Sequence, residues 1–141
     1  ELIMGGTQLK SEHGSFIEPT VFTGVKPEMD IAREEIFGPV LSVIRFKTKE
    51  EAIEIANSTT YGLSASVWTK DMDTAIIMSR EIEAGTVWIN NFMTGFPEIS
   101  FGGFKESGLG RELGRFSIDE FTELKSVVMH IGPSSGNWVG A

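Results

Sequence analysis

The chain has 141 residues and a formal net charge of −8; 40% of its residues are apolar, 23% are charged, and none is cysteine. This length predicts one domain with a buried core. The acidic balance disfavours nucleic acid and anionic membranes as partners, since binding to either depends on lysine and arginine. The lack of cysteine excludes disulfides, thiolate zinc sites and a cysteine nucleophile among these residues.

No apolar run approaches the roughly 20 residues that a membrane-crossing helix requires. The first residues, ELIMGGTQ, also lack the basic and apolar regions of a leader peptide. We therefore expect a soluble, cytoplasmic protein that has neither nucleic acid nor a membrane as a partner.

The N-terminal part of the chain is predicted to be mostly extended. Residues 2–4 fit a strand that ends at two glycines, and residues 11–14 fit a polar turn. Residues 16–22 predict an extended stretch, which Pro19 makes an edge or irregular strand because proline lacks an N–H donor. Residues 29–34 predict a short helix, which the following Phe-Gly-Pro must end, since the residue before proline avoids the helical region.

The centre of the chain alternates between strand and helix patterns. Residues 40–46 form a nearly continuous apolar run, which is typical of a strand covered on both faces. Thr48 and Glu51 form a capping box for the helix that follows, and residues 63–69 predict the next strand.

A second helix is predicted to begin after Asp71, which is a good N-cap residue. We expect Gly85 to end this helix in a left-handed conformation, before a strand over residues 86–90. Strand, helix, strand, helix and strand in this order predict an α/β fold with a mainly parallel sheet flanked by helices. The expected apolar face of the second helix consists of Met72, Ala75, Ile76, Ser79 and Ile82.

The C-terminal part of the chain is less regular. Residues 91–114 lack periodicity and contain many glycines and aromatics, which predicts a functional loop. Ser117 and Glu120 indicate a second capping box, for a helix over residues 118–124. Residues 127–131 alternate as a last strand, and the sequence GPSSGNWVGA looks like a tail.

The sequence EEIFGPV places two carboxylates directly before a predicted strand. Glu34 and Glu35 are neighbours, so their side chains do not face one another and an acid–base pair is disfavoured. One interpretation is a pair of solvated carboxylates at a helix end. The other is a binding site at the mouth of a parallel strand, where one carboxylate accepts both hydroxyls of a ribose and Phe37 packs on the sugar or base.

Other motifs that would indicate chemistry fail on their spacing. The glycine cluster FGGFKESGLGRELG matches neither the phosphate-binding loop nor the dinucleotide fingerprint. Ser107 lacks the preceding glycine of a nucleophile elbow, and His13 and His130 have no metal-ligand spacing. The residues by themselves therefore predict an α/β domain with a glycine-rich loop and a sugar-binding carboxylate.

Five motifs occur in an order that resembles a known enzyme family: FIEPTVF, AREEIFGPVLSVIRF, YGLSASVWTKD, AGTVWIN and FGGFKESGLGRELG. They are similar to the C-terminal part of the catalytic domain of NAD(P)-dependent aldehyde dehydrogenases, and FTELKSVVMHI extends the similarity to Ile131. The resemblance implies oxidation of an aldehyde to a carboxylic acid with NAD or NADP, through a thioester on a cysteine that lies outside this chain. It follows that these residues should be inactive by themselves.

The resemblance also assigns cofactor and substrate residues. Glu35 matches a glutamate that binds the nicotinamide ribose, and Phe37 matches a phenylalanine beside it. Residues 91–100, with Phe92 and Phe96, match the segment that shapes the substrate pocket, and Phe101 matches an aromatic of that pocket. Many relatives have proline at the position of Ser100, so the identity of the aldehyde stays open.

The segment KESGLGRE is similar to members that act on betaine aldehyde or aminoaldehydes. In those members the positions of Lys105 and Gly108 contribute carbonyls to a potassium site, and that of Glu112 is linked to a proton relay. The resemblance therefore implies potassium as a second cofactor.

The similarity divides the chain into residues 1–124 of the catalytic domain, an oligomerisation strand at 125–132 and a tail at 133–141. It implies three partners: the aldehyde substrate, the remainder of an aldehyde dehydrogenase chain, and further copies in a homo-oligomer. An alternative is a stand-alone module without redox chemistry, which keeps the fold for association and nucleotide contact.

Overall fold

The computed structural model describes residues 1–11 and 13–133, and it forms short strands and helices joined by long connections. Residue 12, within the predicted polar turn, and residues 134–141, within the predicted tail, lie outside the described residues. The elements, in chain order, are β1 (Leu2–Met4), β2 (Gln8–Leu9), β3 (Phe16–Ile17), β4 (Thr20–Phe22), α1 (Asp30–Arg33), β5 (Val40–Ser42), α2 (Lys49–Asn57), β6 (Tyr61–Gly62), β7 (Ser64–Val67), α3 (Met72–Glu81), β8 (Thr86–Ile89), β9 (Phe104–Lys105) and α4 (Ser117–Glu120).

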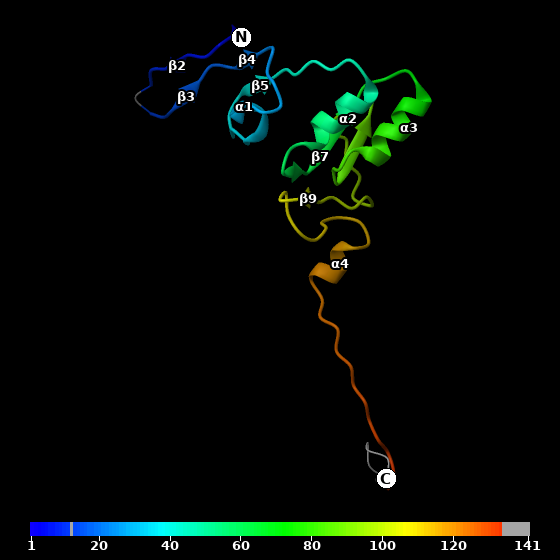
Figure 1. The fold of residues 1–141 in the computed structure, drawn as a ribbon. Coiled ribbons are helices and arrows are strands. Elements are labelled where there is room, and N and C mark those ends of the chain that lie inside the picture. The colour runs from blue at the N-terminus through cyan, green and yellow to red at the C-terminus, as the bar shows by residue number, and fades with distance from the viewer. Residues whose placement is uncertain (12, 134–141) are drawn as a thin grey trace.

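The first part of the chain forms a three-stranded sheet and a separate two-stranded one (Figure 1). In the larger sheet, β4 lies between β1, which is antiparallel to it, and β5, which is parallel. The predicted irregularity at Pro19 is confirmed, because Pro19 separates β3 from β4. Of the two alternatives, edge or irregular, the irregular one applies: β4 begins one residue after the proline, and its own amides can pair on both sides.

The short helix α1 confirms the prediction for residues 29–34. It ends where Glu34 adopts an extended conformation, with φ −95° and ψ 143°. The hydroxyl of Ser42 donates to the carbonyl of Ile31 at 3.1 Å, which ties α1 to the parallel strand β5. Glu34 and Glu35 lie in the connection between these two elements.

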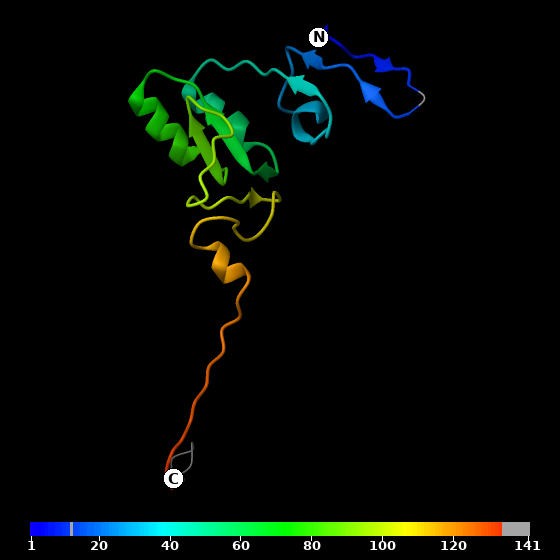
Figure 2. The ribbon, with the colours of Figure 1, turned by 180° about the vertical axis from the view of Figure 1, so that it is seen from behind.

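The central part contains a second parallel pair, β7 and β8, with Ser64 opposite Thr86 and Val67 opposite Ile89. Helix α3 connects these two strands and packs against both, with α2 beside it (Figure 2). This strand–helix–strand unit confirms the predicted crossover. However, β5 and β7 belong to different sheets, so the described residues contain two parallel pairs instead of one continuous parallel sheet.

Both central helices begin at the predicted cap. The hydroxyl of Thr48 accepts a hydrogen bond from the Glu51 amide at 3.2 Å, and the carboxylate of Asp71 accepts one from the Thr74 amide at 2.7 Å. The capping box differs in one detail, because the Glu51 carboxylate accepts from the amide of Lys47 at 2.6 Å instead of from that of Thr48. These bonds satisfy amides that the first helical turn leaves without a partner.

The predicted end of α3 is wrong. The helix is capped by Ile82 in an extended conformation, and Gly85 does not have a positive φ. Gly85 is required for a different reason: a Cβ there would fall on the carbonyl oxygen of Gly102, which lies against this backbone. The predicted apolar face is also only partly buried, because Met72 is 71% exposed whereas Ala75 is buried.

The core of the described residues is small. Its buried apolar side chains are Val25, Val67, Ala75 and Ile82, and none of the large side chains is completely enclosed. The expectation that residues 40–46 form a strand covered on both faces is wrong for this chain, since Leu41 is 58% exposed. The reason is that no described element packs over Leu41 on this face of β5.

The glycine-rich region contains strand β9, which the sequence did not reveal and which pairs antiparallel with β6. The second predicted capping box is wrong. The Ser117 hydroxyl donates to the carbonyl of Gly114 at 2.9 Å, and the Glu120 carboxylate accepts from the amide of Arg111 at 3.3 Å. Helix α4 therefore begins without a side-chain cap and ends at Glu120, four residues before the predicted end.

After α4 the chain runs away from the rest of the molecule in an extended form (Figures 1 and 2). Residues 127–131, called the terminal segment below, pair with no strand among the described residues, and Val128 is 96% exposed. The prediction of a strand is therefore wrong for this chain by itself, because a strand forms only beside a hydrogen-bonding neighbour. Within residues 1–11 and 13–133, no helix has the length and apolar character needed to span a bilayer.

Candidate functional site

Glu35 borders a cavity of about 710 Å³. The cavity is lined by the end of α1, the region from β6 to β7, the connection from α3 to β8, and Glu106 and Ser107 after β9. The Glu35 carboxylate forms no hydrogen bond or ion pair with any described residue. Both of its oxygens are therefore available to a ligand that offers hydroxyl groups.

Phe37 lies at the same turn but does not line this cavity. Its side chain is 91% exposed, and its backbone has a φ of +51°, which is rare for a bulky residue. Such strained residues concentrate at functional sites, where surrounding structure maintains them. The structure thus places Glu35 at a cavity and presents the Phe37 ring to solvent beside it.

Phe101 and Glu112 are held opposite each other by a pair of backbone hydrogen bonds. The amide of each donates to the carbonyl of the other at 2.7 Å. Both residues, with Gly108, line a hollow of about 190 Å³. The structure therefore brings together one predicted substrate aromatic, the predicted proton-relay carboxylate and one of the predicted potassium ligands.

This hollow adjoins the cavity of Glu35, because Leu63 and Ser107 line both. The side-chain oxygen of Ser107 accepts a hydrogen bond from the amide of Gly62 at 2.9 Å. A turn serine therefore forms part of the wall between the predicted cofactor and substrate residues.

Phe92 and Phe96 do not line the hollow to which Phe101 contributes. Phe92 packs edge-on against Trp88, with 5.9 Å between ring centres, and the Trp88 indole donates to the carbonyl of Thr94 at 2.8 Å. The rings of Phe92 and Phe96 are 64% and 55% exposed. The loop is thus anchored on β8, and its aromatics are open to solvent.

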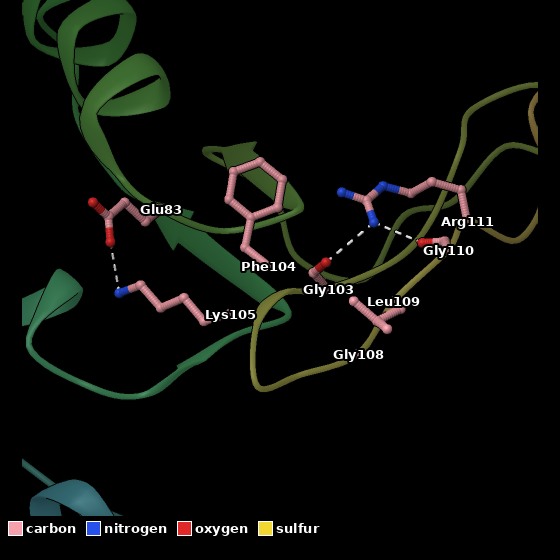
Figure 3. A pocket seen from close by; sticks show the side chains of 8 residues that line it. All are labelled: Glu83, Gly103, Phe104, Lys105, Gly108, Leu109, Gly110 and Arg111. Atoms are coloured by element: carbon pink, nitrogen blue, oxygen red, sulfur yellow. Dashed lines mark hydrogen bonds and ion pairs between the residues drawn. The ribbon is translucent and has the colours of Figure 1, made fainter.

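Lys105 has a role that the sequence did not reveal (Figure 3). Its ammonium lies 2.7 Å from the Glu83 carboxylate and donates to the carbonyls of Asn57 at 2.8 Å and Thr59 at 3.1 Å. The backbone at Lys105 has a φ of +52°. Lys105 and Gly108 line a shallow hollow of about 550 Å³, but the predicted potassium role of their carbonyls stays a prediction.

Arg111 is a second residue that sequence reasoning missed. Its guanidinium donates to the carbonyls of Gly103 at 3.1 Å and Gly110 at 2.6 Å, and it lies 5.5 Å from the centre of the Phe104 ring (Figure 3). These contacts close the glycine-rich loop on itself. The only available signal was an arginine inside a glycine cluster, which does not specify these carbonyl partners.

The side chains around the cavity fit a nicotinamide nucleotide better than a metal ion held by side chains. An uncommitted carboxylate beside a cavity fits the ribose hydroxyls of a nicotinamide nucleotide. Among the residues that the structure describes, no three histidine, cysteine, aspartate or glutamate side chains form a group that could hold a metal ion.

Comparison with known proteins connects this geometry to a family. The model of the aldehyde dehydrogenase family matches residues 1–127. An aldehyde dehydrogenase of Davidiella tassiana is 50% identical over 127 residues, which are 90% of this chain and 26% of that protein. A betaine aldehyde dehydrogenase of Bacillus subtilis is 45% identical over 90% of this chain and 26% of its own length.

A solved structure has the same arrangement of elements. The indole-3-acetaldehyde dehydrogenase AldA of P. syringae, a C302A mutant in complex with NAD+ and IAA, superimposes with a TM-score of 0.85 and 51% identity. The alignment covers 90% of this chain and 26% of that one. The chain therefore spans about a quarter of the length of the relatives that it matches.

Proposed function

Because the chain belongs to the aldehyde dehydrogenase family, we propose that it forms part of an enzyme that oxidises an aldehyde to a carboxylic acid with NAD+. The reaction consumes water and yields a carboxylic acid, NADH and a proton. The observation that supports this proposal best is the Glu35 carboxylate, which borders a cavity and has no partner within the described part of the chain.

The role proposed for Glu35 is to orient the nicotinamide ribose. Its two oxygens accept hydrogen bonds from the two ribose hydroxyls, and an ionised acceptor makes these bonds stronger than neutral ones. Bound NAD+ supplies the acceptor for the hydride. The exposed Phe37 ring offers an apolar face beside the same turn, and the complex of AldA with NAD+ supports this choice of cofactor.

The role proposed for the hollow at Phe101 and Glu112 is on the aldehyde side. The Phe101 ring contributes an apolar wall, and the Glu112 carboxylate accepts a proton released during the reaction. Phe92 and Phe96 lie in the loop that would contact the rest of the aldehyde. A potassium ion held by the carbonyls of Lys105 and Gly108 belongs to the same proposal.

The nucleophile must come from polypeptide other than these 141 residues, because they include no cysteine. The small number of buried apolar side chains also supports the proposal that further polypeptide packs against this chain. Leu41 and Phe46 are 58% and 59% exposed, as expected of side chains that pack against additional protein. We also propose that residues 125–132 pair with a neighbouring copy in a homo-oligomer.

The test uses the complete reading frame that contains this chain, expressed with and without Glu35→Gln. NADH formation is followed at saturating aldehyde while NAD+ is varied. We expect Glu35→Gln to raise the KM for NAD+ at least about tenfold, since a charged hydrogen-bond acceptor is lost. Glu28→Gln, which removes the same charge from an exposed position, is the matched control and should leave KM within about twofold.

Two results would contradict the proposal. One is turnover by the 141-residue chain alone, which would show that no external cysteine is needed. The other is a complete reading frame that supplies no cysteine and shows no NADH formation with any aldehyde. That result would favour a stand-alone association module instead.

A further inference from the structure

The ammonium of Lys105 is surrounded by as many acceptors as it has N–H donors. The three acceptors are the Glu83 carboxylate and the carbonyls of Asn57 and Thr59, at 2.7 to 3.1 Å. An ammonium has three donors, so each acceptor can take one. The Lys105 side chain is 24% exposed and that of Glu83 is 56% exposed, so the ion pair is partly open to water.

The acceptors come from the end of α2 and from the connection that follows α3. Asn57 is the last residue of α2, where helical carbonyls lack a partner and a positive charge is favourable. The Asn57 side chain continues the junction, since it donates to the carbonyl of Glu81 and accepts from the amide of Glu83, at 2.7 and 2.8 Å. One ammonium thus links the end of α2, the exit from α3 and strand β9.

We propose that Lys105 is a positioning residue whose ammonium acts as a built-in monovalent cation and fixes β9 and the turn after it. The turn is attached to β6 by two bonds: the Glu106 amide donates to the Thr60 carbonyl at 3.0 Å, and the Gly62 amide donates to Ser107 at 2.9 Å. Ser107 lies in the wall shared by the cavity of Glu35 and the hollow of Phe101. If the proposed function holds, Lys105 sets the spacing between the cofactor and aldehyde sites.

The geometry also explains why lysine occupies this position. The three acceptors contact a single nitrogen, which suits the compact ammonium. A guanidinium is planar and directs its donors in a fixed fork, so arginine would not reach all three from the same backbone. A small primary ammonium ion, in contrast, carries the same donors and charge.

The experiment is chemical rescue measured by hydrogen–deuterium exchange on the full 141-residue chain. Lys105→Ala removes the atoms of a propylammonium ion, so this ion is the probe. We expect amides of residues 59–62 and 104–107 to exchange on the order of tenfold faster in the variant. Propylammonium should restore their protection, whereas tetramethylammonium, which has a charge but no N–H donor, should not.

Two controls define the result. Lys70→Ala removes an exposed lysine and should change exchange in neither peptide, with or without propylammonium. In Lys105→Arg, the amides of residues 59–62 and 104–107 should exchange as fast as they do in Lys105→Ala. Unchanged exchange in Lys105→Ala, or equal rescue by both ions, would overturn the proposal.

A global loss of structure in Lys105→Ala would show in its circular dichroism, and Glu83→Gln then serves as the test. This variant keeps an acceptor but removes the charge, so faster exchange confined to residues 104–107 supports the proposal and unchanged exchange overturns it. The measurement uses neither aldehyde nor NAD+. Failure of the proposed oxidation would therefore leave this result unaffected.

Discussion

Strand β8 and the terminal segment have similar sequences but differ in burial and in strand pairing. Both are short runs rich in valine and isoleucine, TVWI in β8 and VVMHI in the terminal segment. Every residue of β8 is partly buried, between the parallel strand β7 and helix α3. In the terminal segment Val128 is 96% exposed and pairs with no described residue. A short apolar pattern therefore allows a segment to form a strand, but the strand forms only where a neighbouring strand is present.

Among the substitutions considered, Gly85→Ala is expected to destabilise the unit formed by β7, α3 and β8 most strongly. The new Cβ would collide with the carbonyl of Gly102, which is backbone and cannot rotate away. We expect a loss of about 3 kcal/mol or more in the free energy of unfolding, measured by urea denaturation. Gly95→Ala is the matched control, since a Cβ there meets nothing within 4 Å, and its stability should change by less than about 0.5 kcal/mol. Similar losses in both variants would show that the close approach is unimportant.

The same substitution in the two regions tests the comparison directly. Val87→Asp places a charge in the middle of β8 and should cost about 2 kcal/mol, while Val128→Asp should leave the stability of this chain unchanged. In the complete protein we expect Val128→Asp to dissociate the proposed oligomer, which sedimentation velocity would detect. A stability loss in Val128→Asp within the 141-residue chain would mean that the terminal segment has a partner there.

A smaller loss of stability is expected at the start of α2, which packs beside α3. Thr48→Ala removes the hydroxyl that accepts from the Glu51 amide and should cost about 1 kcal/mol. Thr122→Ala removes a hydroxyl that donates to the carbonyl of Ile118, next to the terminal segment, and should cost less. Thermal unfolding of both variants compares them, and equal losses would contradict the difference between the two regions.

The smallest effect concerns pH and the helix that packs on β8. The Thr74 side chain, and after it the Thr74 amide, hold the pKa of Asp71 below its ordinary value of 3.8. A lowered pKa in the folded state stabilises the protein above the unfolded pKa, and this contribution is lost as the pH falls through the folded pKa. The midpoint temperature of the wild type should therefore exceed that of Asp71→Asn at neutral pH and converge with it below pH 3.8. A difference that persists at low pH would assign the effect to something other than this charge.

Local signals in the sequence correctly predicted the start of both central helices. The caps at Thr48 and Asp71 depend on residues three positions away, and the structure contains both. The second capping box failed because Glu120 is held by Arg111, nine positions earlier, which no local pattern reveals. Strand β9 was missed for a similar reason, since two residues become a strand only by pairing with β6 across more than forty residues.

The role of Glu35 in cofactor binding stays a prediction. The structure shows that Glu35 borders a cavity, which is compatible with that role. The roles of Lys105 and Arg111 depend on carbonyl acceptors, which every residue has, so the sequence contains no signal that distinguishes Asn57 or Gly103 as a partner.

The close approach of Gly85 and Gly102 limits which residues near the proposed aldehyde site can be changed. Gly95 has open space around it, so a side chain can be added there, whereas Ser100 lies against Gly114. Beyond Phe101 the chain lies so close to neighbouring backbone that Gly102 cannot accept a side chain, because a Cβ would sit 2.7 Å from the carbonyl of Gly110. A library for new substrates should therefore vary Gly95 and leave Gly85 and Gly102 intact.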